Sequence, residues 1–212
     1  PGGPAERERT WDSLKLAFSY ARRTPVVRTL ILLALVAELF GWSHNSMLPV
    51  MARDVLGTGV SGMGYLQSAS MAGFVLSTAV ISNLNDIKQK GWLVVGGAML
   101  FAVFLTAFAG ARTLPLAVVA LAAAYAMGAA FDSTLSTVLQ GVVPDGMRGR
   151  IVSFQAFTWG VNGLAGFHTG ALASRFGAPW AIVIGAVVLL LYAVRIVPMA
   201  PRIASVAQWR RP

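Results

Sequence analysis

The sequence contains no cysteine, only two histidines and few charged residues. The absence of cysteine excludes disulfide bonds and thiolate metal sites, although it says nothing about the redox compartment. His44 and His168 stand far apart with no suitably spaced ligand beside either, so they make a poor metal site and no cofactor is expected. Only 12% of the 212 residues are charged, whereas 56% are hydrophobic. A water-soluble domain of this size would have nowhere to bury that much apolar surface.

Long apolar stretches account for most of the chain. A helix needs about 20 mostly apolar residues to cross the hydrocarbon core of a bilayer, and six stretches are close to that length. They run over residues 30–51, 62–84, 92–110, 115–139, 151–173 and 179–198. The gaps between them are too short for a folded domain outside the membrane. We therefore predict an all-α integral membrane protein, with residues 1–29 ahead of a six-helix transmembrane bundle over 30–198 and a basic tail over 199–212.

Basic residues are distributed unevenly between the gaps, and this predicts the orientation of the chain. Of the 17 Lys and Arg residues, only Arg53, Arg112 and Arg175 fall on one side of the membrane. The others precede the first span, lie in the second and fourth gaps, or lie at the end of the chain, where short cytoplasmic segments retain positive charge. Both termini are then cytoplasmic, and we expect a plasma membrane, in bacteria the inner membrane.

The net charge of +9 raises the question of a nucleic-acid partner. The basic residues are dispersed over loops and are not clustered on one face with aromatic side chains, so we expect no nucleic-acid binding. Anionic lipid headgroups on the cytoplasmic leaflet are the expected partner of these charges.

The segment before the first span has its own helical pattern. Trp11, Leu14, Phe18 and Ala21 recur at helical spacing with basic residues between them, and Pro25 ends the pattern. This predicts a short amphipathic helix that lies in the membrane interface within residues 1–29. A partly ordered linker is the alternative.

Small residues recur at four-residue spacing within two of the predicted spans. The second span contains Gly64, Ser68 and Ala72, and the fifth contains Gly166 and Gly170. Such spacing is typical of flat strips where helix backbones approach closely, so we expect helix packing at both places.

Two acidic residues stand out because they fall inside predicted spans. Glu38 lies near the middle of the first span and Asp132 lies in the cytoplasmic half of the fourth. A charged side chain near the centre of a bilayer costs on the order of 3 kcal/mol on insertion scales. A carboxyl group in a low-dielectric cavity can take and release a proton near neutral pH, which favours proton-coupled transport. A structural carboxyl, protonated or bonded to neighbouring hydroxyls, is the alternative.

Other polar residues within the spans extend this group of candidates. Hydroxyl and amide side chains follow Asp132 at steps of three and four residues, so one face of that helix is polar for about two turns. The further candidates for contact with a substrate or with protons are His44, Asn45, Ser136, Gln140, Asn162 and His168. For each histidine, a neutral ring held by one hydrogen bond is the alternative to a proton relay.

The gap after the fourth span resembles a known family of transporters. Pro144, Arg148, Gly149 and Arg150, followed by a glycine-rich helix, resemble the region between the tenth and eleventh helices of the major facilitator superfamily. The run is most similar to the drug:proton antiporter and siderophore-exporter branch. This resemblance implies that the chain is the carboxy-terminal half, helices seven to twelve, built from two inverted three-helix units. It also implies that the helices carrying Glu38 and Asp132 line a central cavity.

The second gap departs from the motif that the superfamily carries in its cytoplasmic loops. Asp86 and Lys90 match that motif. The positions that do not match are Ser82, Ile87, Gln89 and Gly91. Asp86 and Lys90 are therefore either a gating charge pair or solvated loop charges.

The combined prediction is half of a secondary active transporter. We expect proton-coupled efflux of small amphipathic compounds by alternating access, in partnership with a missing amino-terminal six-helix half. An enzyme is not expected, because no Gly-x-Ser-x-Gly-like elbow surrounds a serine in the spans. A six-helix scaffold or assembly partner without transport activity is the alternative.

Overall fold

The structure is a computed structural model that describes residues 19, 22–83 and 90–203. The described residues form helices and no strand. The predicted amphipathic helix around residues 11–21, Asp86 and the last nine residues of the basic tail lie outside the described residues. The fold class, an all-α membrane protein, is confirmed.

The first span is one continuous but irregular helical segment of 31 residues, Pro25–Val55. It begins with Pro25, whose fixed φ suits the first turn of a helix, directly after the extended residue Thr24. Its parts in order are α2 (Pro25–Val36), η1 (Ala37–Gly41), η2 (Trp42–Met47), α3 (Leu48–Val50) and η3 (Met51–Val55). Only α2 and α3 are α-helical, because η1 and η3 are π-helical and η2 is a 3₁₀ helix.

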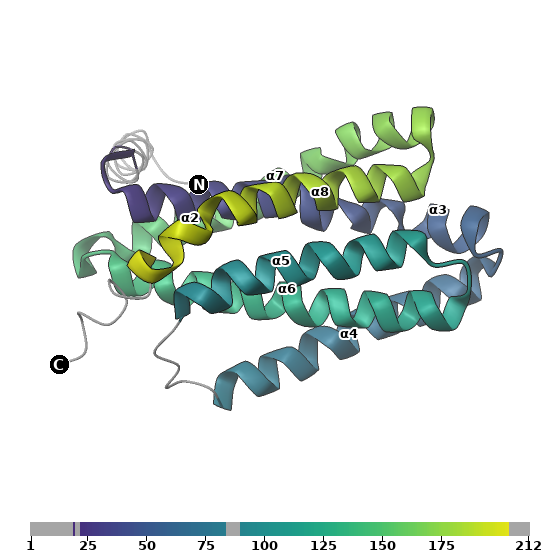
Figure 1. The fold of residues 1–212 in the computed structure, drawn as a ribbon, viewed down its shortest axis with the longest axis horizontal. Helices are drawn as coiled ribbons and strands as arrows, with labels where there is room; N and C mark the ends of the chain where they lie inside the picture. The colour runs from purple at the N-terminus through teal and green to yellow at the C-terminus, as the bar shows by residue number, and fades with distance from the viewer. Residues whose placement is uncertain (1–18, 20–21, 84–89, 204–212) are drawn as a thin grey trace, which may run out of the picture.

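The rest of the chain forms long helices that run side by side with the first span (Figure 1). They are α4 (Gly59–Asn83), α5 (Lys90–Gly110), α6 (Leu114–Val142), α7 (Asp145–Phe176) and α8 (Ala178–Ile196), followed by the 3₁₀ turn η4 (Val197–Met199). Helix α6 packs against α4 and α5, and α8 packs against α5 and α7. The first span contacts α6, α7 and α8 and thus lies between the two groups.

Five helical segments are long and apolar enough to cross a membrane. They correspond to the first four predicted spans and the sixth, and each extends beyond its predicted limits at one end or both. The fifth predicted span, 151–173, lies within α7, which has 32 residues but is not among those five. Its polar residues, among them Asn162, His168 and Thr169, make it less apolar than its neighbours.

The gap predicted between the fourth and fifth spans, residues 140–150, is helical over almost all of its length. Helix α6 continues to Val142 and α7 begins at Asp145, so only Val143 and Pro144 separate them. Pro144 explains the short break, since proline lacks a backbone N–H and forces the residue before it into an extended conformation. Val143 has φ −89° and ψ 138°, as expected.

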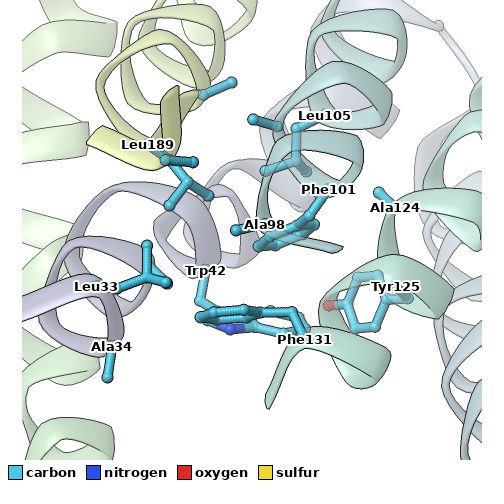
Figure 2. Close-up of a cluster of buried hydrophobic side chains, with 14 of the residues drawn as sticks. Leu33, Ala34, Trp42, Ala98, Phe101, Leu105, Ala124, Tyr125, Phe131 and Leu189 are labelled. Atoms are coloured by element: carbon cyan, nitrogen blue, oxygen red, sulfur yellow. The ribbon is translucent and has the colours of Figure 1, made fainter. Parts of the chain in front are cut away.

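The core is built around an aromatic cluster where the first span meets α5, α6 and α8 (Figure 2). The Trp42 indole packs on Phe101 with ring centroids 4.7 Å apart and meets Tyr125 edge-on at 5.3 Å. Phe101 and Phe131 are fully buried, and Leu189 of α8 closes the cluster from another side. These contacts join residues that are distant in sequence into one core.

Close backbone approaches occur at glycines other than those predicted. A Cβ on Gly73 of α4 would collide with the carbonyl oxygen of Ala122 in α6, and one on Gly185 of α8 would collide with that of Phe40. By contrast, a Cβ on Gly64 or Gly170 would meet no atom within 4 Å. The strip on α4 is exposed and does not pack against another described helix. On α7, Gly170 makes no such contact, whereas a Cβ on Gly166 would lie 3.9 Å from Cβ of Ser46 in the first span, so the expected packing is found there only in part.

We expect Gly73→Ala to destabilise the full-length protein, because the added methyl group collides with a backbone carbonyl that cannot rotate away. A loss of about 1–3 kcal/mol is typical of such overpacking. Thermal unfolding of the detergent-solubilised protein measures it. Gly64→Ala on the same helix is the matched control and should be neutral or more stable by up to about 1 kcal/mol, since alanine favours a helix more than glycine does. Equal melting temperatures for the two variants would contradict the close approach of α4 and α6.

Candidate functional site

The middle of the first span departs from α-helical geometry over residues 37–47. π and 3₁₀ turns leave backbone carbonyls without their usual partners, and side chains of the same segment bond to them. Ser43 Oγ donates to Phe40 O over 3.0 Å, and Ser46 Oγ donates to Ser43 O over 2.8 Å. The Nδ1–H of His44 donates to Gly41 O over 2.8 Å. The irregular segment is thus stabilised by its own side chains.

Glu38 lies in this irregular segment and is bonded to α7. Its side chain is only 6% exposed. The amide Nδ2 of Asn162 donates to Glu38 Oε2 over 3.0 Å and reaches the Glu38 backbone carbonyl at 3.4 Å. Two residues predicted separately, 124 positions apart, therefore meet, and they join the first span to α7.

Asp132 approaches the same place from α6. Its carboxyl group lies close enough to that of Glu38 for the two charges to interact. The two acidic residues predicted from the sequence therefore lie near one another, Glu38 on the first span and Asp132 on α6.

Trp42 occupies a fixed place beside this site. A Cβ on Gly128 of α6 would lie 2.9 Å from two carbons at the tip of the indole ring, so this glycine makes room for the ring. Trp42 is 8% exposed, and its Nε1 forms no hydrogen bond with the described residues. Tryptophans of membrane proteins are enriched at the interfaces, so a tryptophan near the middle of a predicted span was a signal that the sequence interpretation overlooked.

His44 lies inside the aromatic cluster. It is 1% exposed, and its ring centroid lies 5.5 Å from that of Tyr125 and 6.1 Å from that of Phe101. Since Nδ1 carries the proton donated to Gly41 O, Nε2 is left as an acceptor, and it has no partner among the described residues. The His44 ring is thus part of the buried core, with its centroid 6.1 Å from that of the Trp42 ring.

A pocket of about 520 Å³ opens beside Trp42, between the first span, α4 and α6. Its lining residues are Trp42, Asn45, Leu48, Gln67, Ser70, Met71, Phe74 and Tyr125. Asn45 is the one predicted site residue among them, and its Oδ1 accepts a short hydrogen bond from the Tyr125 hydroxyl. The rest were missed because none is ionisable near neutral pH, and uncharged polar or aromatic residues in a span carry no clear signal.

The remaining polar candidates lie away from this pocket. On the last turns of α6, Gln140 Nε2 donates to Ser136 Oγ over 3.1 Å, and both stay within one helix face. His168 packs on Phe40 with ring centroids 5.2 Å apart, and its Nε2 lies 3.3 Å from Thr169 Oγ1. His168 thus contacts the irregular segment from α7.

The residues of the resemblance motif surround the start of α7. Pro144 directly precedes the helix, and Arg148, Gly149 and Arg150 belong to its first two turns. Lys90 is the first residue of α5. Its predicted partner Asp86 lies outside the described residues, so the charge pair stays a prediction.

Comparison with known proteins identifies the family. A family model described as transmembrane secretion effector, from the major facilitator superfamily, matches residues 3–208. Neither a curated protein nor a solved structure matches the chain. Since the family model covers nearly the whole sequence, the chain belongs to the transmembrane secretion effectors, a family of membrane transporters within the major facilitator superfamily.

Proposed function

We propose that this chain is the carboxy-terminal half of a proton-coupled exporter of small amphipathic compounds. It works by alternating access together with an amino-terminal six-helix half, in the plasma membrane. The observation that carries the proposal is the hydrogen bond from Asn162 to the buried Glu38 at the irregular middle of the first span. The Asp132 carboxyl on α6 lies close enough for its charge to interact with that of Glu38. Acidic residues inside a membrane mark ion and proton pathways, and no cation of the described residues neutralises this pair.

Protonation of Glu38 would change the contact between two helices. Asn162 donates to Glu38 Oε2, and a carboxylate accepts such a bond more strongly than a neutral carboxyl does. A proton on Glu38 therefore weakens the link between the first span and α7. Because the bond joins an irregular segment to a long helix, this local change is suited to bias a movement of α7.

The outer faces of α4 and α7 support a role as one half of a larger protein. Large apolar side chains are exposed there, with Val75 of α4 at 63% and Phe167 of α7 at 78%. Others on these two helices are Tyr65, Met71, Phe74, Leu76, Val80, Trp159 and Leu164. Such surfaces suit contact with lipid or with another helical bundle.

Neutralising the acidic pair tests the proposal. In the full-length protein reconstituted in liposomes, we expect Glu38→Gln and Asp132→Asn each to reduce efflux driven by a proton gradient to the level of empty liposomes, with membrane insertion intact. Asp54→Asn is the matched control, because Asp54 is exposed at the end of the first span and pairs only with neighbouring Arg53. Unchanged transport in both single variants would remove the pair from the mechanism. Absence of transport in the wild type as well would favour a scaffold.

The orientation of the bundle can be tested without removing any native cysteine, since the chain has none. Lys90→Cys and Arg112→Cys place single thiols at opposite ends of α5. With both termini cytoplasmic, a membrane-impermeant maleimide added to intact cells should label the variant at position 112 and should label position 90 only after the cells are broken. The reverse pattern would invert the proposed topology.

A further inference from the structure

The pocket beside Trp42 has the features of a small-molecule site. Its volume of about 520 Å³ lies in the range that ligands occupy in proteins. Four helical segments contribute to its walls: the 3₁₀ turn η2, α3, α4 and α6. An aromatic wall and several polar groups converge on this opening.

The aromatic residues of the pocket are held in place by the core. Trp42 is wedged between Phe101 and the gap that Gly128 leaves, and Tyr125 is bonded through its hydroxyl to Asn45. Because these rings cannot turn away, they form a fixed apolar wall. Preorganised rings bind flat aromatic groups with little loss of side-chain entropy.

The polar groups of the pocket leave hydrogen-bonding capacity open to a ligand. The Ser70 hydroxyl donates to Leu66 O over 2.9 Å, and the Tyr125 hydroxyl donates to Asn45 Oδ1. The Asn45 amide N–H groups and the Gln67 amide have no partner among the described residues. The pocket therefore offers both donors and an acceptor, all of them neutral.

Charge decides which class of molecule fits. None of the lining residues is ionised near neutral pH. A charged ligand would lose its hydration without gaining a partner, which is costly in an apolar site. The acidic residue Asp132 is not among the lining residues.

We propose that this pocket binds an uncharged aromatic molecule carrying hydrogen-bonding groups, and that this is where the exported compound rests in this half. The inference rests on the proposed export function.

Binding of N-phenyl-1-naphthylamine, an uncharged aromatic amine, to the full-length protein in lipid nanodiscs tests the site. Saturable enhancement of the dye's fluorescence measures its affinity without any proton gradient. We expect Met71→Trp, which fills the pocket from an exposed position of α4, to weaken binding at least about tenfold. Gln67→Leu should weaken it about three- to tenfold, the effect of one lost hydrogen bond.

Leu76→Trp is the matched control for the filling variant. Leu76 lies on the same helix and is 66% exposed, compared with 56% for Met71, but it does not line the pocket. It should bind the dye as the wild type does. Equal affinities of Met71→Trp and Leu76→Trp would overturn the site, and binding of the permanent cation tetraphenylphosphonium as tightly as the neutral dye would overturn the ligand class.

The same measurements separate this inference from the proposed function. If Asp132→Asn transports normally while dye binding still depends on Met71, proton coupling through Asp132 fails and the pocket stands. If Asp132→Asn abolishes transport but the dye does not bind to the wild-type protein, the proposed ligand site is rejected and the proposed proton coupling is kept.

Discussion

Polar groups inside a bilayer must find partners within the protein, and this constraint shapes the whole structure. It is most severe in the first span, whose backbone leaves α-helical geometry for eleven residues, 37–47. Ser43, His44 and Ser46 bond to the carbonyls of that segment. The packing of α7 and α8 around it then depends on how these side chains hold the segment, since Phe40 O lies directly against Gly185.

The irregular segment brings together two kinds of site. Glu38 bonds to Asn162 of α7, whereas Asn45, seven residues later in the same segment, lines the pocket together with Trp42.

Much of the fold could be predicted because it depends on length, hydropathy and charge. The candidate site was only partly predictable. Glu38 and Asp132 stood out because a carboxyl group is costly in a membrane, and this cost is visible in the sequence. Gln67 and Tyr125 were not predicted as site residues, because uncharged polar side chains are common in membrane spans. Which of them line a pocket depends on the neighbouring helices. The sequence did not predict that Arg148, Gly149 and Arg150 lie in a helix. Only Val143 and Pro144 separate α6 from α7, so these residues already belong to the start of α7.

The sequence by itself determined that the chain crosses the membrane repeatedly as helices, since each apolar stretch can satisfy its backbone only internally. It also marked the two acidic residues that need a partner. The tertiary structure alone decided what those partners are and where the helices touch. Gly73 packs against α6 and Gly64 does not, although both are glycines on one helix. The reason is that close approach, hydrogen bonding and pocket formation depend on which faces of distant segments meet.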